Sequence, residues 1–138
     1  MELLGYQPVA SANANLMNSA YWGDSIIRMW IRHRIRHEFA GRGSGYSPGS
    51  TSHEDRLNSN EQMILFAHAL FPECQGKRIA DNFEAFISYM HDNNYAYEYL
   101  LEAYYQYYML SLPRKKKVWS GVEMRCPLMN HLRKKNKL

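Results

Sequence analysis

Apolar residues recur at helical spacing in four stretches of this chain, and no stretch shows the strict alternation typical of a strand. In residues 18–40 the apolar positions follow four-residue steps: Ile27, Ile31, Ile35 and Phe39, with Trp22, Ile26 and Trp30 on an adjoining line. The second stretch, 60–71, follows Ser59, whose hydroxyl can cap a helix, with Gln62 three residues later as its capping-box partner. Both patterns predict amphipathic helices.

The third and fourth stretches have the clearest apolar faces. In the third, the apolar positions are Ile79, Phe83, Phe86, Ile87 and Met90. In the fourth, 95–112, they are Tyr97, Leu101, Tyr104, Tyr108 and Leu112, and Pro113 ends the pattern. We therefore predict an all-α fold, a small helical domain of four to six helices.

Tyrosines dominate the fourth stretch and have two candidate roles. A tyrosine stripe at helical spacing is typical of a core or an interface, with the hydroxyls reaching the rim. We favour the core for this stripe. Tyr105 and Tyr107 are the candidates for an exposed partner surface, where a ring can stack on a nucleobase.

Glycine and proline mark the divisions of the chain. Residues 41–51, GRGSGYSPGST, are predicted to form a loop, and we expect His53, Glu54 and Asp55 to lie in a loop as well. The predicted organisation is a helical body over 1–112, with the glycine-rich loop at 41–51, and a basic module over 113–138. The module either packs on the body or extends from it.

The charge of the chain is strongly polarised, although its formal net charge is only +4. Residues 113–138 carry nine Lys or Arg and one acid, whereas residues 54–103 carry nine acids and three bases, a net charge of −6. Each Lys or Arg placed on a phosphate releases condensed counterions, so the basic end favours a nucleic-acid partner. Apolar residues such as Trp119 and Leu128 interrupt the basic run, and we expect part of it to pack.

The basic end has the layout of a helix-turn-helix. Residues 112–120 could form the first helix, Gly121 the turn, and 122–135 the second helix, which would enter the major groove. Pro127 lacks a backbone donor and costs about 3 kcal/mol inside a helix, so a looser basic module stays open as well. The side chains expected to contact DNA are Arg114, Lys115, Lys116, Lys117, Arg125, Asn130, His131, Arg133, Lys134 and Lys135.

Three stretches of the chain carry a family resemblance. They are Trp30 with Ile31 and Arg32, the GRGSGYSP run at 41–48, and LLEAYYQYYMLSL at 100–112. Their order, ahead of a basic end, resembles the Q antitermination proteins of lambdoid phages, of the phage 21 type. The resemblance implies a protein that binds a DNA site near a late promoter and loads onto a paused RNA polymerase holding sigma factor. It also implies that the protein narrows the RNA exit channel, which prevents terminator hairpins from forming.

A second basic site follows from the arginines of the first predicted helix. Arg28, Arg32 and Arg36 repeat at four-residue steps beside the apolar line. They either form a solvent face paired with acids such as Asp24 and Glu38, or recognise phosphate or carboxylate through their planar guanidinium groups. The side chains expected to face polymerase or RNA are Arg28, Arg32, Arg36, Arg42 and Tyr46.

Catalysis and cofactor binding find little support in the sequence. His33 and His37 are four residues apart, but the neighbouring arginines would repel a cation, so we expect no metal and no other cofactor. His53, Glu54 and Asp55 are capable of acid–base chemistry, yet nothing in the sequence positions them. We predict that the chain is not an enzyme.

The remaining features bear on where the protein acts. Cys74 and Cys126 are isolated, no apolar run is long enough to span a membrane, and the N-terminal residues lack the pattern of a signal peptide. We therefore expect the cytoplasm of a bacterial host, with no membrane partner.

The leading hypothesis is a phage transcription antitermination factor. Its partners would be promoter DNA, bacterial RNA polymerase with sigma factor, and nascent RNA as a further candidate. One alternative is a small phage-encoded inhibitor of a host nucleic-acid complex, in which acids such as Asp81, Glu84 and Asp92 mimic phosphate. The other is a basic DNA- or RNA-binding protein without sequence preference.

Overall fold

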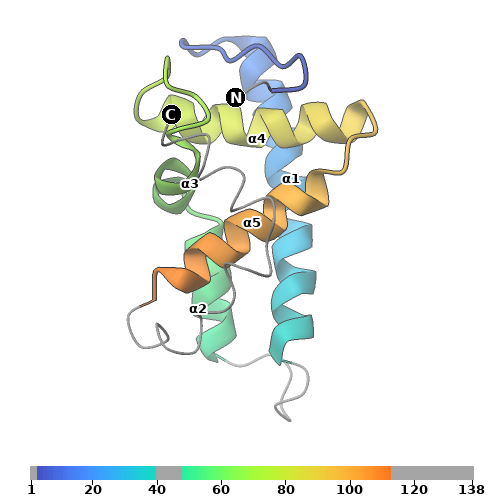
Figure 1. Cartoon of the computed structure of the whole chain (residues 1–138), viewed down its shortest axis with the longest axis vertical. Helices are drawn as coiled ribbons and strands as arrows, with labels where there is room; N and C mark the ends of the chain where they lie inside the picture. The colour runs from blue at the N-terminus through green and yellow to red at the C-terminus, as the bar shows by residue number, and fades with distance from the viewer. Residues whose placement is uncertain (1–2, 40–47, 113–138) are drawn as a thin grey trace.

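The computed structural model describes residues 3–39 and 48–112, which form five helices and no strand (Figure 1). The helices are α1 (Ala14–Phe39), α2 (Pro48–Leu57), α3 (Asn60–Ala67), α4 (Lys77–Asp92) and α5 (Tyr97–Leu110). The prediction of an all-α domain is confirmed for this part of the chain. Residues 113–138 lie outside the described residues, so their helix-turn-helix stays a prediction. Of the five helices, none combines the length and the apolar character needed to cross a membrane.

Side-chain caps and a proline set where three of the helices begin. The Ser59 hydroxyl accepts a hydrogen bond of 3.3 Å from the Gln62 amide at the start of α3, which confirms the predicted cap. Asn13 plays the same part for α1, because its side-chain oxygen accepts a bond of 2.7 Å from the Leu16 amide. Helix α1 therefore begins at Ala14 rather than at residue 18.

Helix α2 corrects the predicted loop. It begins at Pro48, and it contains His53, Glu54 and Asp55, which we expected to lie in a loop. Proline breaks a helix when it lies inside it. At the first helical position, however, the backbone N–H of any residue lacks an acceptor within the helix, so proline loses no hydrogen bond there, and its fixed φ suits the helix. The loop prediction is therefore wrong from Pro48 onward.

Helix α4 is the centre of the fold, and α1 crosses it (Figure 1). The predicted apolar face of α4 is confirmed as buried, but burial continues around the helix, because residues 79–88 are all buried. The crossing is close because Gly23 of α1 has no side chain. A Cβ atom at Gly23 would lie 1.8 Å from the carbonyl oxygen of Glu84. Only glycine permits this approach of two backbones.

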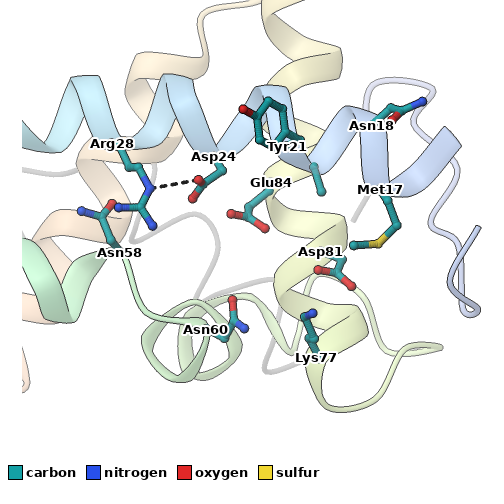
Figure 2. Close-up of a pocket in the computed structure, with 11 residues that line it drawn as sticks. Met17, Asn18, Tyr21, Asp24, Arg28, Asn58, Asn60, Lys77, Asp81 and Glu84 are labelled. Atoms are coloured by element: carbon teal, nitrogen blue, oxygen red, sulfur yellow. Dashed lines mark hydrogen bonds and ion pairs between the residues drawn. The ribbon is translucent and has the colours of Figure 1, made fainter. Parts of the chain in front are cut away.

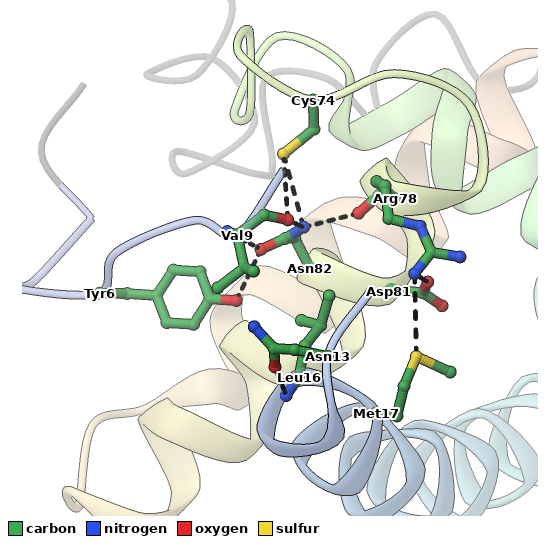
Figure 3. Close-up of polar contacts among 9 residues, drawn as sticks. All are labelled: Tyr6, Val9, Asn13, Leu16, Met17, Cys74, Arg78, Asp81 and Asn82. Atoms are coloured by element: carbon green, nitrogen blue, oxygen red, sulfur yellow. Dashed lines mark hydrogen bonds and ion pairs between the residues drawn. The ribbon is translucent and has the colours of Figure 1, made fainter. Parts of the chain in front are cut away.

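The N-terminal residues are anchored to α4 by the fully buried Asn82 (Figure 3). The side-chain oxygen of Asn82 accepts hydrogen bonds from the Tyr6 hydroxyl and the Val9 amide, each 2.8 Å long. Its amide nitrogen donates a bond of 2.8 Å to the Val9 carbonyl and lies 3.4 Å from the Cys74 sulfur. A buried amide with all of these partners fixes the segment that leads into α1.

Helix α5 brings tyrosine rings into the core. Tyr104, Tyr105 and Tyr108 are buried, and the Tyr104 hydroxyl donates a hydrogen bond of 2.6 Å to the Leu57 carbonyl. The core role of the tyrosine stripe is thereby confirmed, but the expected exposure of Tyr105 is wrong. Helix α5 packs on two sides, and the guanidinium of Arg34 on α1 lies 4.4 Å from the centre of the Tyr105 ring.

We predict that Gly23→Ala destabilises the fold by about 3 kcal/mol or more. Helix propensity alone favours alanine by about 1 kcal/mol, so a loss of stability reports the clash with the backbone of Glu84. Chemical denaturation followed by circular dichroism measures the change. The control is Ser25→Ala, at an exposed position of the same helix, which should stay within about 0.5 kcal/mol. An alanine variant as stable as the original protein would contradict the close crossing.

Candidate interaction site on helix α1

Helix α1 carries the three predicted site residues that the structure describes: Arg28, Arg32 and Arg36. Arg42, Tyr46 and the ten residues predicted to contact DNA lie outside the described residues, and their roles stay predictions. The candidate site in the described part of the chain is therefore the surface around α1.

Two of the three arginines are held by acids. Arg28 pairs with Asp24 on the same helix at 2.9 Å, and Arg32 pairs with the buried Glu54 of α2 at 3.0 Å. Arg36 is exposed and forms no ion pair with a residue in the described ranges. One of the two interpretations of these arginines was a solvent face paired with acids, and it named Asp24 as a partner correctly. The partner of Arg32, Glu54, lies on α2, a helix that the sequence pattern did not predict.

Arg34, on the side of α1 that faces α5, clamps the two helices together. Its Nε and Nη2 atoms donate to the two carboxylate oxygens of Glu102, at 2.8 and 3.1 Å. Burial by itself would lower the pKa of Arg34, but the hydrogen bond and the charge of Glu102 outweigh burial and raise that pKa. The Arg34 guanidinium therefore serves the fold rather than an outside ligand.

A polar pocket of about 630 Å³ lies beside α1 on the side of Asp24 and Arg28 (Figure 2). The charged residues in its lining are Asp24 and Arg28 of α1 and Lys77, Asp81 and Glu84 of α4. Asp81 is tied to Arg78 at 3.0 Å. Within the described ranges, no three His, Cys, Asp or Glu side chains come together as metal ligands.

Glu84 is the unusual group in this polar pocket. Burial, a hydrogen bond with Asp24 and the charges of Asp24 and Asp81 raise the pKa of Glu84 to about 9, against the opposing effect of Arg28. The Glu84 carboxyl is therefore protonated at neutral pH and can donate a hydrogen bond. The pocket thus presents a neutral acid, two aspartate side chains and two cationic side chains, a set suited to hydrogen bonding with a polar group.

Two of the three residues of α2 with a capacity for acid–base chemistry are engaged in other contacts. Glu54 is held by Arg32, as described above, and His53 Nδ1 lies 2.7 Å from the Tyr108 hydroxyl. Asp55 is exposed. These contacts assign structural roles to His53 and Glu54, and the absence of enzymatic activity stays a prediction.

An apolar groove of about 400 Å³ lies on another side of α1, and the sequence did not reveal it. Its apolar lining consists of Trp22, Ile26, Met29, Trp30 and Tyr97. Of the three residues on the line adjoining the buried isoleucines, Ile26 and Trp30 pack against the core, whereas Trp22 is 47% exposed. Met29 is 66% exposed. One signal in the sequence could have revealed the groove. The apolar residues of α1 span a wider arc of the helix than the other helices can cover, so part of that arc has to stay exposed.

Comparison with known protein families, with characterised proteins and with solved structures gave no match to this chain. The likeness to Q antitermination proteins therefore rests on the short stretches quoted above, and function has to be argued from charge and geometry.

We predict that Glu84→Gln removes a pH dependence from the stability of the protein. A carboxyl whose pKa is raised by folding binds a proton in the folded state and not in the unfolded state between about pH 5 and 9. The stability of the original protein should therefore fall as pH rises through this window, by at most about 1.4 kcal/mol per pH unit from this group. The glutamine variant should lack that part of the slope, because it stays neutral and keeps a donor. Denaturation curves at several pH values measure both slopes, and equal slopes would show that Glu84 is ionised in the folded state.

Proposed function

We propose that this chain is a phage or prophage transcription antitermination factor, which binds promoter DNA through residues 113–138 and also binds RNA polymerase. The observation that carries the proposal is the separation of charge. Nine bases and one acid occupy residues 113–138, whereas residues 54–103 have a net charge of −6. The stretches that resemble Q antitermination proteins support the same function.

The ion pairs of the body favour residues 113–138 as the main contact for phosphate. Arg28 and Arg32 are already engaged by Asp24 and Glu54, so phosphate binding by α1 would first have to break two ion pairs. Of the three predicted arginines of α1, Arg36 is the one with no ion pair among the described residues. We therefore assign DNA binding to the basic module and contact with polymerase or RNA to the side of α1 that carries Arg28 and Arg32.

The burial of the acids weighs against the inhibitor hypothesis. Mimicry of phosphate needs exposed carboxylates, but Asp81 is 2% exposed and Glu84 is 8% exposed. Glu84 is also protonated at neutral pH, which removes its charge. Of the three acids that we assigned to such an interface, only Asp92 is exposed.

Reversing Lys115, Lys116 and Lys117 to glutamate is expected to abolish promoter-DNA binding and antitermination while the helical fold survives. Each phosphate contact contributes about 0.9 to the slope of log affinity against log salt concentration, so these three lysines should account for about 3 of the slope of the original protein. Fluorescence anisotropy at several salt concentrations measures binding, with a duplex selected from a random library. In vitro transcription across a terminator measures antitermination.

The matched control replaces the same three lysines with arginine, which keeps the charge and should keep both activities. Unchanged binding and unchanged terminator read-through in the glutamate variant would contradict the proposal. Equal affinity of the original protein for every duplex in the library would instead favour a nucleic-acid-binding protein without sequence preference.

A further inference from the structure

The outermost line of α1 forms a continuous exposed surface, which we call the outer face. Its members follow three- and four-residue steps opposite the buried isoleucines of the same helix: Trp22, Ser25, Met29, His33 and Arg36. All five are exposed, and Trp22 and Met29 also border the apolar groove. Exposed tryptophan, methionine and arginine together are typical of the central residues of protein interfaces.

Charge is distributed unevenly along the outer face. At the Trp22 end, the ring of His91 lies 5.9 Å from the Trp22 ring, and the Asp92 carboxylate, which lies 3.2 Å from His91 Nδ1, stays 62% exposed. At the other end, Arg36 and His37 are exposed. Met29 lies midway, seven residues from both Trp22 and Arg36. The surface therefore has an acidic end, an apolar middle and a basic end.

We propose that the outer face binds the outer face of a second copy of this chain, with the two α1 helices antiparallel about a two-fold axis near Met29. In this arrangement each residue before Met29 meets the residue equally far beyond it in the second copy. Trp22 and Asp92 of one copy then meet Arg36 of the other. Both ends become complementary at once, which is the requirement for a two-fold symmetric interface.

The contacts made in this arrangement are of favourable kinds. Arg36 would lie against the Trp22 ring, a cation–π pair, and near the Asp92 carboxylate. Met29 would pack against Met29, which covers the most exposed apolar side chain of the face. A parallel arrangement would instead place Arg36 beside Arg36, so charge favours the antiparallel one.

Other occupants fit the outer face less well. A nucleic acid would be attracted by Arg36 but repelled by two acids. Glu98 lines the groove, and Asp92 lies next to His91, which also lines it. An unrelated protein would need a surface with a basic end and an acidic end at the matching spacing. A second copy of this chain has both ends at that spacing already. The inference does not depend on the proposed function, because it rests on the outer face alone.

Sedimentation of the full-length chain over a range of concentrations tests association directly. We expect a monomer–dimer equilibrium, and we expect Met29→Asp to raise the dimer dissociation constant by at least about tenfold. The matched control is Leu65→Asp, which places the same charge at an exposed apolar position on α3 and should leave association unchanged. Circular dichroism of each variant shows that the helices are retained.

A charge swap tests the antiparallel arrangement. Arg36→Glu alone should weaken the dimer by about tenfold, and Asp92→Arg alone should also weaken it. The double variant should form a tighter dimer than either single variant, because the two ends then attract again with reversed signs. A double variant no tighter than the single variants would overturn the antiparallel arrangement.

A disulfide tests the position of the axis. In a Cys126→Ser background, Met29→Cys should give a covalent dimer under mild oxidation, because a residue on a two-fold axis lies next to its own copy. Leu65→Cys in the same background should give none, and Cys74 is buried in both proteins. A monomer at all concentrations would overturn the proposal. If Met29→Asp then weakened binding to polymerase, the outer face would be assigned to that partner instead.

Discussion

The rest of the described structure depends on one contact between two backbones, where Gly23 of α1 meets Glu84 of α4. A side chain on Gly23 would occupy the position of the Glu84 carbonyl oxygen, so the helices can cross this closely only at a glycine. The close crossing buries α4 on all sides over residues 79–88 and lets Ile27 and Ile31 reach the core. The polar Asn82 of α4 is also buried, and it satisfies its side-chain amide by fixing the N-terminal segment.

The same crossing governs the electrostatics of the body. It brings the Glu84 carboxyl against Asp24, where burial and like charge keep Glu84 protonated. Asp24 in turn holds Arg28, while Glu54 holds Arg32 and Glu102 holds Arg34. Much of the charge of the body is therefore neutralised internally. What α1 presents outward is an apolar and partly charged face, which is better suited to another protein surface than to phosphate.

The sequence predicted features that depend on local periodicity and failed on those that depend on distant partners. The cap at Ser59, the buried face of α4 and the core tyrosines follow from spacing alone, and all three are confirmed. Tyr105 was a candidate for the surface because the apolar pattern of one helix does not reveal how many other helices pack against it. The start of α2 was missed because Pro48 can either break or begin a helix. The partners of Asn82, Arg32 and Gly23 lie far away in the chain, so no local pattern could reveal them.

Hydrogen–deuterium exchange of the full-length chain, measured residue by residue, tests the central role of the α1–α4 crossing most directly. Elements that stabilise each other open together, so their slowest amides share one free energy of opening. We expect the amides around Gly23 in α1 and around Glu84 in α4 to be among the slowest to exchange and to have the same opening free energy. Slow exchange in α4 with fast exchange in α1 would contradict this expectation, because α4 would then be stable without the crossing.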